Sequence, residues 1–267
     1  MNRLPTLFIS HGSPMRAIDP GDAGRAWVAR ARALPLPKAL LIASAHWESS
    51  VPMLTGSEHP KTVHDFGGFP RELFAIEYPA PGDPGMATRA VALLKQAGIA
   101  AGIDGCRGLD HGAWVPLRWM YPQADIPVVE LSVQPGMDTA HHLRIGRALQ
   151  PLAAEGVLIV GSGHATHNLR DWTPSSQRRD VMPYAQEFST WLHEKLDKGD
   201  TDALLAYRDQ APGATRAHPS EEHFLPLFVA LGAAGGEFRA ERFAQGFEGG
   251  SLALDSYMFT PSSRTLQ

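Results

Sequence analysis

Residues 157–164 read VLIVGSGH, a run of four aliphatic residues followed by Gly-Ser-Gly and a histidine. Three other apolar runs of strand length occur along the chain, at Thr6–Ser10, Ala39–Ala45 and Ile126–Val133, and Val157–Val160 is the fourth. These runs are continuously apolar and do not alternate with polar residues. They therefore predict strands of a sheet that is covered on both faces.

Stretches with helical spacing of apolar residues lie between and after these strands. The expected helices are 22–33, 84–98, 139–154, 184–197 and 220–233. Strands that alternate with helices predict an α/β sandwich with a central, mostly parallel or mixed sheet and helices on both faces. Strand-like fragments in 237–258 are expected to close an edge of this sheet.

The composition indicates a single globular domain. Of the 267 residues, 43% are hydrophobic and 19% are charged, which is sufficient for a large core. Glycine and proline are spread over the whole chain, without a repeat or a low-complexity tract, so we expect one domain over 1–267. Residues 51–82, rich in Gly, Pro and aromatic residues, are expected to form a long ordered loop.

Charge, cysteine content and hydropathy narrow the choice of partners. A formal charge of −4 gives no electrostatic reason to expect nucleic acid. The single cysteine, Cys106, cannot form an intramolecular disulfide or a multi-cysteine metal site. No apolar run has the length of a signal peptide core or of a membrane span. We therefore expect a cytoplasmic protein without a membrane partner, either a monomer or a small homo-oligomer.

Histidines follow three of the predicted strands. His11 follows the first and His46 the second, whereas His164 and His167 follow the run at 157–160. Ligands of open α/β sheets bind at the carboxyl ends of the strands, and imidazole is a common ligand of zinc and non-haem iron. Three strand ends that each bring a histidine predict a metal site at that edge of the sheet.

Two further histidines are candidates for the same site. His223 follows Ser220, a possible helix N-cap, although Pro226 indicates that the helix starts later or is kinked. His111 lies in a predicted loop, 108–114, between aspartate, glycine and tryptophan, a setting that suits substrate binding or proton transfer.

The remaining histidines are assigned other places. His59 and His64 belong to the long loop, in which His64–Pro70 could form a lid with aromatic faces for a planar substrate. The other four are expected on the surface: His141, His142, His193 and His218.

Six short motifs occur in order along the chain. They are His11–Met15, Ser44–Trp47, His64–Pro70, Tyr78–Gly82, Leu109–Trp114 and Glu222–Leu227. Together they resemble the class III extradiol ring-cleavage dioxygenases, specifically the 4,5-DOPA dioxygenase type, from residue 6 to about residue 258. The resemblance implies one catalytic domain over 1–267 that opens a catechol ring with O₂.

The resemblance also implies a mononuclear non-haem metal site. The metal would be Fe(II) in the catalytic form, with Zn(II) possible in isolated protein. By motif, the ligands would be His11, His46 and His223. His167 matches a family histidine placed at the metal, a candidate acid/base and fourth ligand, and His111 matches a histidine near the substrate.

Two positions depart from the family pattern. Many members of the wider class use two histidines and one carboxylate, whereas the matching position here is His223, with Glu222 beside it. His164 stands where the family more often has a small residue. The identity of the metal, Fe or Zn, and a possible extra ligand are therefore open.

The expected reaction is extradiol cleavage of a catechol chelated by Fe(II). His167 would take a phenolic proton and later return one, with His111 as its helper. The substrate-binding candidates are Ser13, Trp47, Phe66 and Trp114, with Phe69 as a further aromatic. Candidates to bind a substrate carboxylate are Arg71, Arg107 and Arg118, each of which is expected by default on the solvated surface.

Two alternatives use the same histidines. A zinc hydrolase or deacylase would use zinc-bound water, with Glu222 or a histidine as base. A metal-binding interaction protein would keep the scaffold without turnover. Oxygen uptake with catechols separates a dioxygenase from both.

Overall fold

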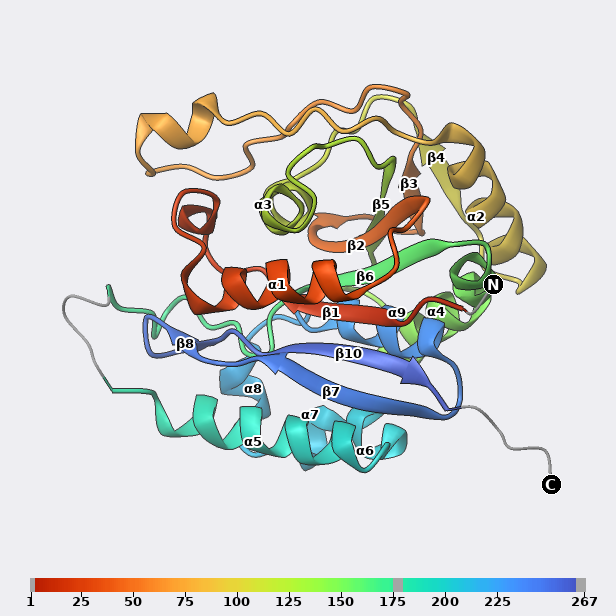
Figure 1. Ribbon diagram of the computed structural model, residues 1–267. Helices are drawn as coiled ribbons and strands as arrows, with labels where there is room; N and C mark the ends of the chain where they lie inside the picture. Colours follow the sequence, from red (N-terminus) through yellow and green to blue (C-terminus); the bar gives the residue numbers. More distant parts are fainter. Residues whose placement is uncertain (1–2, 175–179, 263–267) are drawn as a thin grey trace.

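The structure is a computed structural model that describes residues 3–174 and 180–262. Its main strands are β1 (Thr6–Ser10), β2 (Ala39–Glu48), β3 (Met53–Thr55), β4 (Gly102–Asp104), β5 (Val128–Val133), β6 (Val157–Gly163), β7 (Phe238–Ala244) and β10 (Ser256–Pro261). They form one sheet in the order β4-β3-β5-β2-β6-β1-β10-β7 (Figure 1). A small separate hairpin pairs β8 (Phe247–Glu248) with β9 (Leu252–Ala253).

The centre of the sheet is parallel, an antiparallel pairing flanks it on each side, and the edge strand β4 runs parallel to β3. Strands β5, β2, β6 and β1 run parallel to one another, whereas β10 pairs antiparallel with β1 and β7, and β3 pairs antiparallel with β5. Every residue of β1, β5 and β6 is buried, as the continuous apolar runs predict. The predicted mixed, mostly parallel sheet is confirmed, and the C-terminal segment closes one edge of it through β7.

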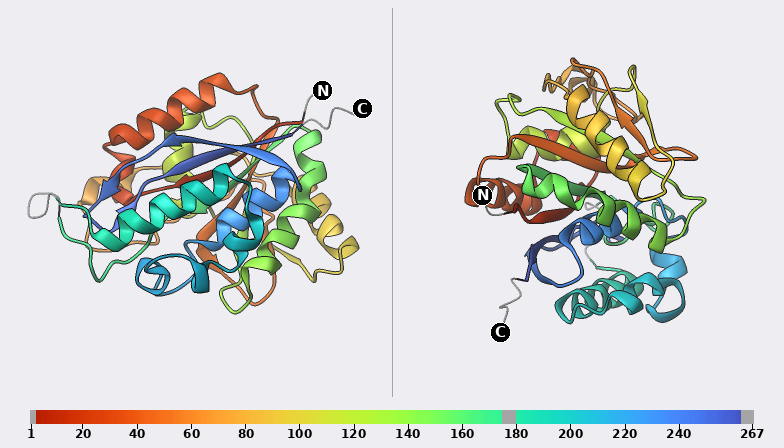
Figure 2. Two further views of the ribbon diagram at one scale, coloured as in Figure 1. Left: turned by 90° about the horizontal axis from the view of Figure 1, so that it is seen from below. Right: turned by 90° about the vertical axis from the view of Figure 1, so that its right-hand side faces the viewer.

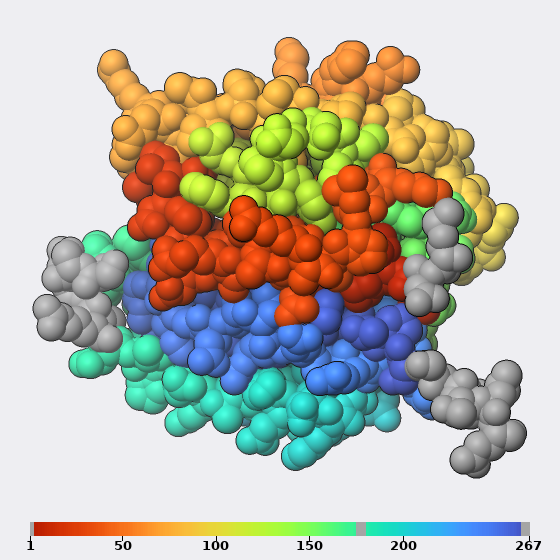
Figure 3. Space-filling view, viewed as in Figure 1, coloured from red at the N-terminus to blue at the C-terminus, as the bar shows by residue number. Residues whose placement is uncertain are grey.

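Helices cover both faces of the sheet (Figures 1 and 2). They are α1 (Gly21–Ala33), α2 (Pro84–Gln96), α3 (His111–Met120), α4 (Thr139–Ala154), α5 (Pro183–Asp197), α6 (Thr201–Leu205), α7 (Tyr207–Gln210), α8 (Ala214–Ala217) and α9 (Leu225–Ala234), with short 3-10 helices η1 (Pro14–Ala17) and η2 (Arg71–Ala75). Helices α1 and α3 share a core with Leu7 and Ile9, whereas α2, α4 and α9 pack on the other face with Leu41 and Ile159. Figure 3 shows α1 lying between α3 and the C-terminal strands. Within the described ranges, no helix has both the length and the apolar character needed to cross a bilayer.

Several elements differ from the sequence-based expectation. The region 108–114, expected as a loop, contains the start of α3, although Gly112 and Pro116 disfavour a helix; burial of Trp114 and Leu117 against the core offsets that cost. The expected helix 220–233 begins only at Leu225, because Pro226 is accommodated in a first helical turn, where its missing N–H needs no partner. The long loop 51–82 contains β3 and η2, and α6 to α8 were not expected.

The prediction of four surface histidines is wrong for three of them. His142 and His218 are fully buried and His141 is also buried, whereas His193 is half-buried. His218 Nε2 donates to the carbonyl of Ala165 at 2.9 Å. Burial lowers the pKa of both His142 and His218 to about 4, so both are neutral at neutral pH. As neutral imidazoles they satisfy backbone groups inside the protein, a role that sequence spacing does not reveal.

Candidate active site

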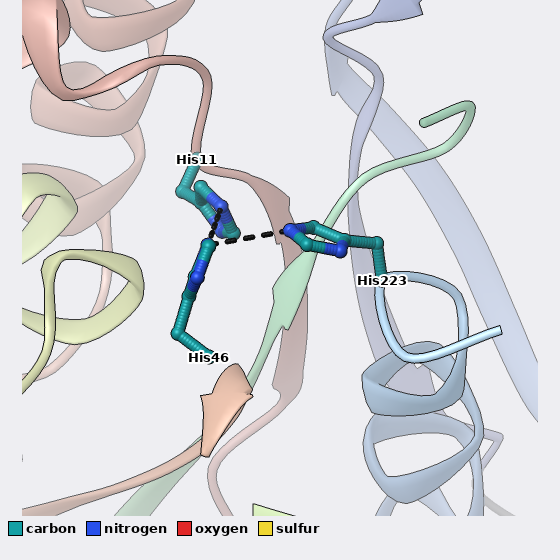
Figure 4. Close-up of side chains that lie close together, drawn as sticks. All are labelled: His11, His46 and His223. Carbon is teal, nitrogen blue, oxygen red and sulfur yellow. Dashed lines mark hydrogen bonds between the residues drawn. The ribbon is translucent and has the colours of Figure 1, made fainter. Parts of the chain in front are cut away.

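Three imidazoles converge at the carboxyl end of the parallel strands (Figure 4). His11 directly follows β1, His46 lies near the end of β2, and His223 lies two residues before α9. Nε2 of His46 is 3.0 Å from Nε2 of His11 and 3.2 Å from Nε2 of His223. The structure therefore brings together the three histidines predicted as metal ligands. The structure differs from the prediction in that β2 continues through His46, which lies within a shift in the register of β2 with β5.

Two glycines of β6 allow the segment that carries His223 to lie directly on the sheet. A Cβ atom on Gly163 would be 2.1 Å from the carbonyl oxygen of His223, and one on Gly161 would be 2.1 Å from that of Pro226. The same contact is fixed by a hydrogen bond, since the backbone N–H of His164 donates to the carbonyl of His223 at 2.8 Å. The Gly-Ser-Gly sequence at the end of β6 thus places the third histidine beside the other two.

A hydrogen-bond chain sets the tautomer of His11. The hydroxyl of Ser162 donates to the carbonyl of Gly112, so it faces His11 as an acceptor. Nδ1 of His11 lies 3.0 Å from this hydroxyl oxygen and must carry the proton that it donates. Nε2 of His11 therefore presents a lone pair to the other two imidazoles.

Carboxylates fix the tautomers of the other two imidazoles, those of His223 and His46. Nδ1 of His223 donates to Oε1 of Glu222 at 3.0 Å, and Nδ1 of His46 lies 3.3 Å from Oδ2 of Asp65. Second-sphere carboxylates of this kind hold metal-ligating histidines in orientation and increase their basicity. Glu222 is thus hydrogen-bonded to Nδ1 of His223, whereas Nε2 of His223 is directed at His46.

The three imidazoles form a donor set that fits one metal ion. Burial, followed by the nearby imidazole of His111, lowers the pKa of His46 to about 4. Burial and nearby imidazoles also lower the pKa values of His11 and His223 well below the ordinary value. All three are thus neutral, and their ligand atoms lie within 4.8 Å of one another. The Nε2 separations of 3.0 and 3.2 Å are short enough for these nitrogens to bind one ion through bonds of about 2.1 Å.

Asp65 connects the long loop to two histidines at once. Its Oδ2 accepts from Nδ1 of His111 at 2.9 Å, and its Oδ1 accepts from the backbone N–H of His111 at 2.9 Å. Burial alone would raise the pKa of Asp65, but the hydrogen bonds from His111 and the proximity of the His111 and His46 imidazoles lower it to about 2. The ionised carboxylate holds His111 with its ring centroid 3.9 Å from that of His46.

His167 and His164 lie beside the three imidazoles. The ring of His167 stacks on that of His223, with centroids 3.4 Å apart and an interplanar angle of 10°. Burial, followed by the nearby imidazoles, lowers the pKa of His167 to about 2, so it is neutral. Nε2 of His164 accepts from the backbone N–H of Gly12 at 3.2 Å, which commits this nitrogen to the backbone.

A cavity of about 630 Å³ opens at these histidines. Its lining includes Ser13 and Phe66, two of the four predicted substrate-binding residues, together with Phe69. The other two, Trp47 and Trp114, are buried in the protein and do not line this cavity. Trp114 is fully buried and donates through Nε1 to the carbonyl of Val63, and Trp47 is buried beneath the guanidinium of Arg107.

Comparison with known proteins identifies the family. Residues 5–251 match the family described as the catalytic LigB subunit of aromatic ring-opening dioxygenase. The chain belongs to this family. It is 45% identical, over 97% of both chains, to a Beta vulgaris protein named 4,5-DOPA dioxygenase extradiol, and 39% identical, over 94% of this chain and 93% of the relative, to a protein of the same name from Escherichia coli K12.

A solved structure agrees with this assignment. The crystal structure of an uncharacterized protein from Escherichia coli K12 has a TM-score of 0.82 to this chain, at 35% sequence identity, and the match covers 96% of this chain and 99% of that one. Family membership implies a non-haem metal, and the set formed by His11, His46 and His223 is a group of residues that could hold it.

The three arginine candidates of this LigB-family dioxygenase are absent from the cavity lining, and only Arg71 has the exposed position expected by default. Arg71 is exposed, Arg107 pairs with Asp110 at 2.9 Å, and Arg118 donates to the carbonyl of Ala17 at 3.2 Å. Among the residues that the structure describes, the arginine that lines the cavity is Arg16. Sequence reasoning missed it, although it follows His11 by five residues.

Three other contributors were also missed as parts of the site. They are Ser162, Asp65 and Glu248, of which Glu248 lines the cavity. Asp65 had a detectable signal, since it lies within one of the family motifs, next to His64. Glu248 has none, because it reaches the site only through the β8–β9 hairpin, far along the chain.

Proposed function

We propose that this dioxygenase performs extradiol cleavage of a DOPA-like catechol, using O₂ and Fe(II) held by His11, His46 and His223. The observation that carries the proposal is the convergence of three Nε2 atoms at one end of a cavity with aromatic walls. The substrate class follows from the names of the relatives, which are 4,5-DOPA dioxygenases. Zn(II) fits the same nitrogen donors but has no redox chemistry, so we expect iron in the active form.

The chemistry that Fe(II) would supply is the activation of a chelated catechol and O₂ toward each other. The protein supplies the proton transfers. His167 lines the cavity and its ring stacks on that of His223, so its imidazole is placed to exchange a proton with a catechol hydroxyl. His111 donates from Nδ1 to Asp65, which leaves its Nε2 as an acceptor for a substrate hydroxyl.

Aromatic side chains would position the ring of the substrate. Phe66 and Phe69 line the cavity, and the ring of Phe66 meets that of His111 edge-on at 5.7 Å. Flat apolar walls of this kind exclude water and hold a planar ring by contact with its faces and edges. The loop that contains Asp65 thus supplies both a hydrogen-bond acceptor for His111 and part of the cavity wall.

Oxygen consumption tests the proposal directly. Protein reconstituted anaerobically with Fe(II) is mixed with O₂ and a panel of catechols that includes DOPA and protocatechuate, while the visible absorbance of ring-opened product is recorded. We expect O₂ uptake in equal amount to a yellow product, and no uptake by Zn(II)-loaded protein. Protein with one iron per chain that consumes no O₂ with any catechol contradicts the proposal and favours hydrolysis.

Substitutions separate the ligands from the proton-transfer residues. His46→Ala is expected to abolish stoichiometric metal binding, because one of three donors is removed. His167→Ala is expected to keep one metal per chain and to lower kcat by about 10²- to 10⁴-fold, the usual contribution of a general acid or base. Metal content by elemental analysis and kcat by O₂ uptake distinguish the two, with His59→Ala, at an exposed histidine, as the control. Loss of metal in His167→Ala would show instead that His167 is a ligand.

A further inference from the structure

A largely buried ion pair lies in the wall of the same cavity. Nη2 of Arg16, in η1, is 3.1 Å from Oε2 of Glu248, in β8, and Nε of Arg16 donates to that oxygen at 3.2 Å. The hydroxyl of Ser13 donates to Oε1 of Glu248 at 2.6 Å. The two charged side chains are only 19% and 12% exposed, and both line the cavity that contains the three converging histidines.

The local backbone is built around the side chain of Arg16. Gly12 and Gly21 have φ angles of +73° and +55°, in the left-handed region that favours glycine. A Cβ atom on Gly12 would lie 2.7 Å from Cγ of Arg16, and one on Gly21 would lie 2.2 Å from its Nη1. The backbone of Arg16 is also held, because Nε1 of Trp119 donates to its carbonyl at 2.7 Å. The guanidinium thus has a defined position before any ligand arrives.

Stability alone is a weak reason for this arrangement. Burying an ion pair costs hydration free energy that the attraction between the charges often fails to recover. A guanidinium has five N–H donors, and its bonds to Glu248 use those on Nε and Nη2 only. Arginine at such a position is well suited to bind a carboxylate.

The charges in the cavity lining match a zwitterion. Among the lining residues that the structure describes, the charged side chains other than histidine are Arg16, Glu248 and the exposed Asp19. One cationic side chain beside two anionic side chains can bind the carboxylate and the ammonium group of one ligand at the same time. A cavity of about 630 Å³ also leaves space beyond a single catechol ring.

We propose that Arg16 and Glu248 bind the charged tail of the catechol substrate and thereby select catechols that carry an α-amino acid. Arg16 binds the carboxylate of the tail, and Glu248, assisted by Asp19, binds its ammonium group. The inference rests on the proposed function, because it requires the ring to lie at the three histidines and the tail to point toward η1 and β8.

Four catechols that differ only in the tail test this assignment. DOPA carries both charges, 3,4-dihydroxyphenylpropionate carries the carboxylate, dopamine carries the ammonium group, and 4-methylcatechol carries neither. Dissociation constants are measured by calorimetry on the anaerobic Fe(II) protein, and kcat/KM is measured by O₂ uptake. The variants are Arg16→Gln and Glu248→Gln, with Arg89→Gln as matched control, since Arg89 forms an exposed ion pair with Glu155 on the α2 and α4 side.

Each variant is expected to lose a different selectivity. Arg16→Gln lowers the preference for 3,4-dihydroxyphenylpropionate over 4-methylcatechol by roughly 10- to 100-fold, the range for one charge-assisted hydrogen bond. Glu248→Gln lowers the preference for dopamine over 4-methylcatechol by a similar factor. Both variants lose preference for DOPA, and Arg89→Gln retains the preferences of the unmodified protein.

Other outcomes overturn the assignment. Equal losses with all four catechols would show that the pair only clamps η1 to β8, and preferences like those of the unmodified protein would show that it does not meet the tail. Failure of the proposed function looks different, because the unmodified protein would then open none of the four rings. The dissociation constants still decide the tail site in that case, since they require no turnover.

Discussion

His142 bridges two backbone groups in the connection between β5 and α4. Its Nδ1 donates to the carbonyl of Asp138 at 2.9 Å, and its Nε2 accepts from the backbone N–H of Gln134 at 3.1 Å. Both nitrogens are thus satisfied by the protein, whereas in the active site the Nε2 atoms of His11 and His46 face each other. The partner of the second nitrogen distinguishes a structural histidine from a ligand.

The bonding of His142 predicts a pH dependence of stability. Burial lowers its pKa from 6.5 to about 4, so the unfolded chain takes up a proton first as the pH falls. The contribution of His142 to the free energy of unfolding is therefore complete above pH 6.5. It is lost as the pH falls toward 4, by about 3 kcal/mol in total. In urea unfolding at pH 7, 6 and 5, the advantage of the unmodified protein over His142→Gln should shrink as the pH falls. Exposed His59→Gln is the control, and a constant difference for His142→Gln would contradict the prediction.

At this scale, the residue pattern identified candidates and the family resemblance supplied their expected roles. His11 and His46 were predicted because they follow strands and His223 because it lies near an expected helix start, and the resemblance then implied that all three are metal ligands. The same twelve histidines include His142 and His218, for which the sequence suggested the surface. Their hydrogen-bond partners include Gln134 and Ala165, and only the folded structure shows which partner each ring nitrogen has.

Strand β6 is the element that brings His223 to the other two histidines. Gly163→Ala would place a methyl group 2.1 Å from the carbonyl oxygen of His223, a backbone atom that must then move. We expect a loss of metal affinity of about 10- to 100-fold, as for disturbed ligand orientation, and a loss of stability of about 1–3 kcal/mol. Metal titration and thermal unfolding measure the two effects.

Gly105→Ala provides the control for this substitution, because a Cβ atom there meets no neighbour within 4 Å. Unchanged metal affinity in Gly163→Ala would show that the segment before α9 can shift without disturbing the site.

Among the elements, the buried strands were the most predictable, since a short, continuously apolar run is typical of a strand that is covered on both faces. Helix α3 was not, because its Gly112 and Pro116 are tolerated only through packing with distant residues.

For the whole molecule, the site joins segments that are far apart in the chain. His11 directly follows β1, His46 lies in β2, and His223 lies in the segment before α9. An ion bound by all three stabilises only the folded chain, by about 2.7 kcal/mol at a free concentration of one hundred times its Kd. Removal of the metal by a chelator should therefore lower Tm, by roughly 5–10 °C for a chain of this size.

Differential scanning calorimetry with and without Fe(II) or Zn(II) tests this linkage. His46→Ala should unfold at the same temperature with and without metal, because it lacks one donor. A rise in Tm of the same size in His46→Ala would mean that the stabilising ion binds elsewhere.

The overall architecture was predictable from the sequence at this scale. The contact between Arg16 and Glu248 was not, because 231 intervening residues separate them.

The position of β10 has a consequence for biosynthesis. Strand β1 pairs with β6 on one side and with β10 on the other, and the hydroxyl of Ser10, next to His11, donates to the carbonyl of Asp255 at 2.7 Å. A ribosome makes β1 long before β10, so the outer side of β1 stays open until β10 has been synthesised. Tight metal capture is therefore expected to follow synthesis of β10, and nascent chains stalled before residue 255 should bind the ion weakly.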